Sequence, residues 1–148
     1  MTDERIFLEV AYRNEVPARR LRTEEEIDSF LVELSEAGWE YTSASVYALV
    51  EDAETDPDHE MIIAFDKNTG LGAVRYSGGE AIPGSEATEW FSVGDRVNAG
   101  GVEFAYFGTG HEFPDNSEVS LDVVRQAMWE LLTNRGGRPT NVQWQVWE

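Results

Sequence analysis

The stretch FPDNSEVSLDVVRQAMWELLTNRGGRPTNVQWQVW, residues 113–147, decides the fold because it predicts four consecutive structural units. An acidic turn with a proline, at 113–116, precedes a helix whose N-cap is Ser120. The apolar stripe of that helix consists of Val124, Ala127, Met128 and Leu131. Gly136 ends the helix, and the alternating residues 141–147 predict a closing strand. The stretch holds no set of residues equipped for catalysis, which favours binding over turnover.

A second helix is predicted upstream, beginning at Thr23. The Thr23 hydroxyl and the Glu26 carboxylate, three residues apart, form a capping-box signature. The apolar residues that follow recur at helical spacing and are Ile27, Phe30, Leu31 and Leu34. Gly38 is expected to end this helix as a left-handed cap.

Alternating apolar residues predict the strands. They lie at 5–12, 43–50, 61–65, 71–76, around 90–93, 102–107 and 141–147. Asn68 and Gly70 are expected to supply positive φ in a tight hairpin between two of them, and 102–107 is expected to pair with the strand at 90–93. We therefore predict one α+β domain over 1–148. Its mostly antiparallel sheet has about six to seven strands, with two helices packed on one face.

Composition narrows the class of protein. Hydrophobic residues make up 41% of the 148 residues and aromatics 11%, enough for a packed core. The chain has no cysteine, which removes disulfides and thiolate chemistry and fits a reducing compartment. It also lacks a signal-peptide pattern and any apolar run long enough to span a membrane. We expect a soluble, cytoplasmic protein that binds no membrane.

The charge is the second strong indication. Eleven basic and 29 acidic residues give a net charge of −18, and residues 23–66 contain no lysine or arginine. Direct nucleic-acid binding is disfavoured, because neutralising phosphates requires the opposite sign. A basic partner is favoured, although high acidity also serves solubility alone.

Catalytic and metal-binding motifs are absent from the sequence. His59 and His111, the only histidines, sit beside acids in predicted loops and are interpreted as solvated. No spacing fits a metal site, a phosphate loop or a nucleophile elbow. We expect no enzyme activity, no metal and no cofactor. A hydrolase that uses paired carboxylates stays open as an alternative, because such a pair has no sequence signature.

The tryptophans separate into two groups. Trp144 stands at an inward strand position and Trp129 beside the helical stripe, and both are interpreted as core. Trp90 and Phe91 are flanked by acids, a composition that fits either a binding hot spot or a short buried strand.

Six segments carry a resemblance to a known family. They are FPDNSEVS (113–120), VRQA (124–127), ELL (130–132), RPTNVQW (138–144), DHE (58–60) and GLGAVRY (70–76). Together they resemble the first numbered immunity-protein family of bacterial polymorphic toxin systems. The resemblance implies a non-enzymatic α+β antidote that binds and blocks a secreted toxin domain, often a nucleic-acid deaminase and sometimes a nuclease.

The predicted function is therefore neutralisation of a basic, nucleic-acid-acting toxin in a one-to-one complex, with an acidic face occupying the toxin's substrate surface. Two alternatives remain open: an antidote to a nuclease toxin, and an acidic DNA mimic or regulatory adaptor that binds another basic protein. The candidate contact residues are acidic or aromatic and lie mostly in predicted loops. They are Asp52, Glu54, Asp56, Asp58, Glu80, Glu86, Glu89, Trp90, Phe91, Asp95, Phe107, Glu112, Phe113 and Asp115.

Overall fold

Two helices and ten strands form the part of the chain that the computed structural model describes, residues 5–51, 57–78 and 88–147. The helices are α1 (Glu24–Glu36) and α2 (Leu121–Thr133). The strands are β1 (Ile6–Ala11), β2 (Arg19–Leu21), β3 (Ser43–Val50), β4 (His59–Asp66), β5 (Leu71–Gly78), β6 (Glu89–Ser92), β7 (Val102–Tyr106), β8 (Thr109–Phe113), β9 (Val119–Ser120) and β10 (Trp144–Gln145). Neither helix is long and apolar enough to cross a membrane, within the residues described.

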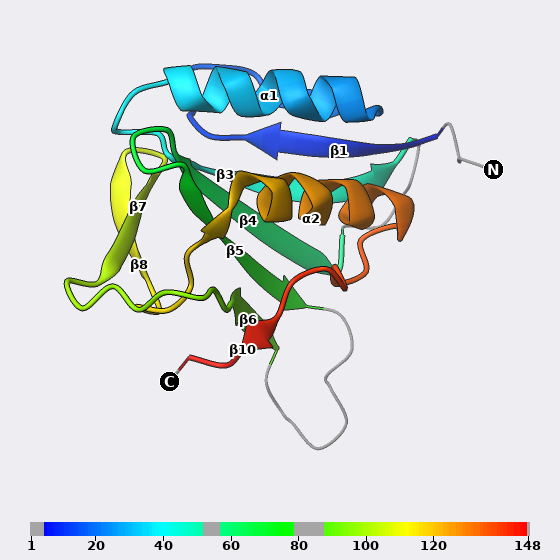
Figure 1. Cartoon of the computed structure of the whole chain (residues 1–148). Helices are drawn as coiled ribbons and strands as arrows, with labels where there is room; N and C mark the ends of the chain where they lie inside the picture. Colours follow the sequence, from blue (N-terminus) through cyan, green and yellow to red (C-terminus); the bar gives the residue numbers. More distant parts are fainter. Residues whose placement is uncertain (1–4, 52–56, 79–87, 148) are drawn as a thin grey trace.

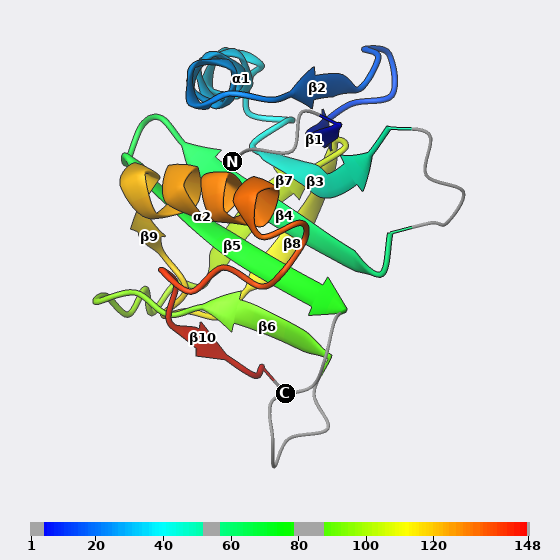
Figure 2. The same cartoon turned by 90° about the vertical axis from the view of Figure 1, so that its right-hand side faces the viewer.

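The main sheet has the strand order β10-β6-β5-β4-β3-β1-β2, with antiparallel neighbours throughout (Figure 1; β2 is labelled in Figure 2). β9 pairs with one end of β5. β7 and β8 form an antiparallel hairpin, which we call the β7–β8 hairpin, and it joins the sheet through one parallel pair, Ser43 with Tyr106. The α+β class and the mostly antiparallel sheet are as predicted, but the strand number was too low.

The sheet is covered on both faces, by different elements (Figure 2). Met61 and Ile63 of β4 point into the larger core, which α1 and α2 cover. Ile62 and Ala64 point the opposite way, into a smaller core beneath the β7–β8 hairpin. Side chains alternate between the faces of a strand, so β4 packs against both layers at once. The predicted placement of both helices on one face is confirmed.

Both helices begin at the predicted N-caps. The Thr23 side chain accepts a hydrogen bond from the Glu26 N–H at 3.1 Å, and the Ser120 hydroxyl accepts one from the Val123 N–H at 3.4 Å. Arg125 of α2 forms an ion pair with Asp28 of α1 at 2.5 Å, which links the two helices. Each helix buries the apolar stripe expected from its spacing.

The segment after α2 folds back over the edge of the larger core. The guanidinium of Arg138 lies 4.5 Å from the ring centroid of Trp90, a cation–π contact. The Tyr76 hydroxyl donates to the Gly136 carbonyl oxygen at 2.7 Å, and the Trp144 indole N–H donates to the Pro139 carbonyl oxygen at 2.8 Å. The contacts of Gly136 and Arg138 therefore hold this segment against the sheet, and the hydrogen bond between Trp144 and Pro139 stabilises the segment itself.

Four details of the predicted strands were wrong. The strand at 102–107 pairs with β8 and β3, whereas β6 pairs with β5 and β10. β2, β8 and β9 were not predicted, because they are short or lack alternation. The closing strand covers only Trp144–Gln145. In the β4–β5 turn, Gly70 has the positive φ, at 73°, and Asn68 does not.

Gly94 lies where two backbone segments approach each other closely. Its N–H donates to the Asn116 carbonyl oxygen at 2.7 Å, and a Cβ added there would lie 1.6 Å from the Glu118 carbonyl oxygen. Because the obstacle is backbone, Gly94→Ala should lower the free energy of unfolding by about 2–3 kcal/mol. Urea denaturation measures the change.

Gly100→Ala is the matched control. The nearest heavy atom to an added Cβ there is Asn98 Oδ1, at 3.5 Å, an ordinary contact. This substitution should change stability by less than about 1 kcal/mol. Equal unfolding midpoints for the two variants would contradict the close approach at Gly94.

Candidate functional site

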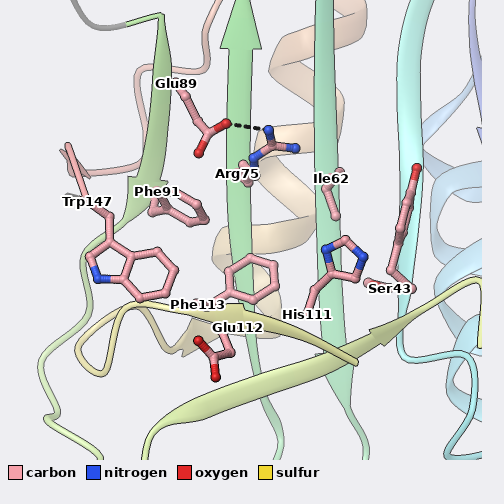
Figure 3. Close-up of a pocket in the computed structure, with 10 residues that line it drawn as sticks. Ser43, Ile62, Arg75, Glu89, Phe91, His111, Glu112, Phe113 and Trp147 are labelled. Atoms are coloured by element: carbon pink, nitrogen blue, oxygen red, sulfur yellow. Dashed lines mark hydrogen bonds and ion pairs between the residues drawn. The ribbon is translucent and has the colours of Figure 1, made fainter. Parts of the chain in front are cut away.

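A pocket opens where the β7–β8 hairpin crosses the sheet, with a volume of about 290 Å³. We call it the hairpin pocket (Figure 3). It is lined by Ser43, Ile62, Arg75, Glu89, Phe91, Tyr106, His111, Glu112, Phe113 and Trp147. These residues come from β3, β4, β5, β6, the hairpin and the C-terminal segment, so tertiary packing alone brings them together.

Aromatic rings build one wall of the pocket and fix the hairpin to the sheet. Phe91 of β6 meets Phe113 of β8 edge to face, with ring centroids 5.6 Å apart. Phe113 meets Phe104 of β7 in the same way at 5.4 Å. Trp147 packs edge to face on Phe91, also at 5.4 Å, and remains 44% exposed. Such contacts hold rigid rings in a fixed geometry, so this wall is preformed.

A charged network crosses the open part of the same sheet face. Arg75 of β5 forms ion pairs with Glu60 of β4, at 3.5 Å, and with Glu89 of β6. The Tyr47 hydroxyl of β3 donates to the Glu60 carboxylate at 2.5 Å. Two carboxylates thus share one guanidinium, which leaves the network with a net negative charge.

The surroundings of this network raise the pKa values of two tyrosines, Tyr47 and Tyr106. Burial raises the pKa of Tyr47 well above 10.0, and the hydrogen bond to Glu60 raises it further. Burial also raises the pKa of Tyr106, with a further contribution from the charge of Glu60. Both phenols therefore stay neutral over the physiological range and act as hydrogen-bond donors or packing surfaces.

The structure brings four predicted contact residues to the hairpin pocket: Glu89, Phe91, Glu112 and Phe113. The two phenylalanines are buried in the smaller core, and the Glu112 carboxylate points away from Arg75 and Ile62 (Figure 3). Asp115 lines an adjoining pocket of about 390 Å³ together with Glu112 and Phe113.

The other predicted contact residues are scattered. Trp90 is only 2% exposed and packs in the larger core. Of the two interpretations of Trp90, the short buried strand is therefore correct and the binding hot spot is not. Asp95 lines a separate pocket next to β9, and Asp58 is exposed beside β4. Phe107 lies at the turn of the β7–β8 hairpin, with a φ of 52°. The remaining predicted residues lie outside the described ones and are Asp52, Glu54, Asp56, Glu80 and Glu86.

His59 is not solvated, contrary to its sequence interpretation. Its ring is buried, stacks on Tyr76, and leaves no room for a Cβ at Gly136. The Ala48 N–H donates to His59 Nε2 at 3.0 Å, and His59 Nδ1 lies 3.3 Å from Asp58 Oδ1. The alternation of residue 59 with Met61 and Ile63 was the available signal. It places His59 on the inward face of β4 and gives it a structural role.

Several residues of the pocket and of the charged network could not be identified from the sequence. Tyr47, Glu60 and Arg75 occupy alternate positions on neighbouring strands, so only strand pairing shows that they meet. The Ser43 hydroxyl donates to the Ala105 carbonyl oxygen at 2.8 Å and thereby holds β7 to β3. No group of three or more potential ligands among the described residues is arranged to hold a metal ion.

Tyr47→Phe tests the network. At neutral pH the lost hydrogen bond to Glu60 should lower the free energy of unfolding by about 0.5–1.5 kcal/mol. Because the folded-state pKa of Tyr47 is raised, its contribution is present below the unfolded pKa of about 10.0 and is lost as pH rises further. Above pH 10, the stability of the variant should therefore fall less steeply than that of the parent protein. Urea denaturation at several pH values above 10 measures this difference. If stability falls with pH equally steeply in both proteins, the raised pKa of Tyr47 is contradicted.

Comparison with known proteins identifies the family. The model of the family described as "Immunity protein Imm1" matches residues 17–146. No curated protein matches the chain. The matched region runs from β2 through β10 and contains both helices, every segment of the resemblance and all the lining residues of the hairpin pocket except Trp147. Because this match covers most of the chain, the protein belongs to the Imm1 family of immunity proteins.

Proposed function

We propose that this protein neutralises a cognate toxin domain that acts on DNA or RNA, a deaminase in the first instance, by covering its basic substrate surface in a one-to-one complex. The observation that carries the proposal is the family match over residues 17–146 in a chain with a net charge of −18. A toxin that binds phosphates needs a positive groove, and an acidic protein is complementary to that groove. The site of action is the cytoplasm of the cell that makes the toxin.

The pattern of ion pairs supports this electrostatic role. Arginines on both layers are paired with acids of the same chain, so they do not form a free basic patch. The pairs are Arg13–Glu15, Arg19–Glu33, Arg22–Glu51, Arg75–Glu89 and Arg125–Asp28. The acidic surplus is left to shape the long-range field, which accelerates encounter with a basic partner.

The outer side of the β7–β8 hairpin is the strongest candidate for the contact surface. Glu112 and Asp115 are exposed there, near the half-exposed ring of Trp147. Aromatic surface inside a ring of acids is a composition suited to a basic protein interface. In the charged network, Glu60 and Glu89 are both engaged by Arg75, an arrangement that supports binding rather than acid–base catalysis.

The experiment pairs the protein with the toxin domain encoded by the neighbouring gene. The two should co-purify, and the protein should suppress modification of single-stranded DNA or RNA by that domain. If the neighbouring toxin cleaves the nucleic acid, the cognate toxin is a nuclease and not a deaminase. Failure to bind the neighbour, combined with binding to unrelated basic proteins, would favour the DNA mimic instead.

Charge reversal tests the contact surface. Glu112→Lys combined with Asp115→Lys should weaken binding at least about tenfold at low salt, mainly through slower association. The dependence of affinity on salt should also become shallower, because fewer charge pairs form across the interface. Surface plasmon resonance at several salt concentrations measures both effects.

Glu25→Lys combined with Asp122→Lys is the matched control. It changes the net charge equally, but the two acids are exposed on α1 and α2, on the opposite side of the sheet. Affinity should stay within about twofold of that of the parent protein. If both double variants bind the toxin equally weakly, the net charge of the protein determines affinity and the hairpin surface does not.

A further inference from the structure

Trp39 is the most exposed large apolar side chain among the described residues, at 82%. Tryptophan side chains ordinarily bury most of their large surface, and exposed tryptophans on rigid backbone are enriched at interface hot spots. Trp39 follows α1 in a short connection without any pattern of its own, so nothing in the sequence marks it.

The backbone around Trp39 is held from both sides. The Tyr41 N–H donates to the Gly38 carbonyl oxygen at 3.1 Å, and the Gly108 N–H of the hairpin turn donates to the Glu40 carbonyl oxygen at 3.2 Å. Thr42 is tied to Ala105 of β7 by two hydrogen bonds, at 3.0 Å and 2.7 Å. Trp39 is therefore presented on an ordered turn, which lowers the entropy cost of a contact made by its ring.

A groove of about 400 Å³ lies beside this ring, and we call it the Trp39 groove. It is bounded by the end of α1, the β4–β5 turn and the β7–β8 hairpin. Its apolar lining comes from Leu34, Phe65 and Phe104. The charged residues that line it are Asp66, Lys67 and Glu103, with a net charge of −1.

Glu103 gives the groove its chemical preference. It stands directly opposite Glu112 across the hairpin, and like charges in that position repel each other. A Cβ at Gly110 would lie 2.4 Å from Glu103 Oε1, so the missing side chain leaves room for this carboxylate on the hairpin surface. No ion pair within the described residues neutralises Glu103 or Glu112.

We infer that the Trp39 groove receives an arginine or lysine side chain of the toxin, with the cation between the Trp39 ring and the Glu103 carboxylate. The inference rests on the proposed function and adds its anchoring contact. An aliphatic stem fits the apolar lining, the indole face attracts the cation, and the incoming charge relieves the repulsion between Glu103 and Glu112. Glu103 also lines the pocket that contains Asp115, so the groove continues the acidic hairpin surface.

The test measures affinity for the co-purified toxin domain. Trp39→Ala should weaken binding at least about 30-fold, mainly through faster dissociation, as at other interface hot spots. Glu103→Gln should weaken it about 3- to 10-fold. If both residues hold the same side chain, Glu103→Gln added to Trp39→Ala should cost less than about twofold more.

Val97→Ala is the control, because Val97 is 71% exposed and does not line the groove. It should leave affinity within about twofold, and urea denaturation should show all variants to be as stable as the parent. Tight toxin binding by the parent together with unchanged binding by Trp39→Ala overturns this inference alone. If the losses of binding free energy from the two substitutions add fully in the double variant, Trp39 and Glu103 do not hold the same toxin side chain. A parent protein that binds no toxin overturns the proposed function and this inference together.

Discussion

Burial of β4 and β5 on both faces is the constraint on which the rest of the structure depends. Each strand directs one set of side chains toward the helices and the alternate set toward the β7–β8 hairpin. Strands in an antiparallel sheet more often face solvent on one side. Here Ile62, Ala64 and Ala73 would be exposed without the hairpin, and Ile63 and Val74 without α2. The protein therefore needs both layers, and the two layers are free to serve different purposes.

The helical layer serves stability. The segment after α2 closes the larger core through Arg138 over Trp90 and through the hydrogen bond from Tyr76 to Gly136. Arg138 lies in the segment 138–144 and Tyr76 in the segment 70–76, both of which carry the resemblance to the family, so these contacts give the two segments a structural role. His59 belongs to the same arrangement, since its ring fills the space that Gly136 leaves. A segment that carries a family resemblance can thus have a packing role within the fold.

Exposed acidic and aromatic side chains lie on and beside the β7–β8 hairpin. Phe91, Phe104 and Phe113 attach the hairpin to the sheet, and this packing leaves Glu103 and Glu112 on its outer side. Two tryptophans are exposed beside the hairpin. Trp147 lines a pocket together with Glu103 and Glu112, and Trp39 lines the groove that contains Glu103. Five arginines among the described residues are engaged in internal ion pairs, whereas none of these pairs involves Glu103 or Glu112. In the proposed function, these two acids carry the charge that meets the partner.

The sequence by itself determined the features that depend on neighbours a few residues away. These include the caps at Thr23 and Ser120, the helical stripes, the alternation of the central strands, the sign of the charge and the family. The tertiary structure alone decided the partner of β7, the inward position of Trp90, the outward position of Trp39 and the meeting of Glu60 with Arg75 and Glu89. Strand pairing and side-chain burial depend on packing between distant segments. Alternation shows that a strand has two faces, but the layers that cover it determine what each face contacts.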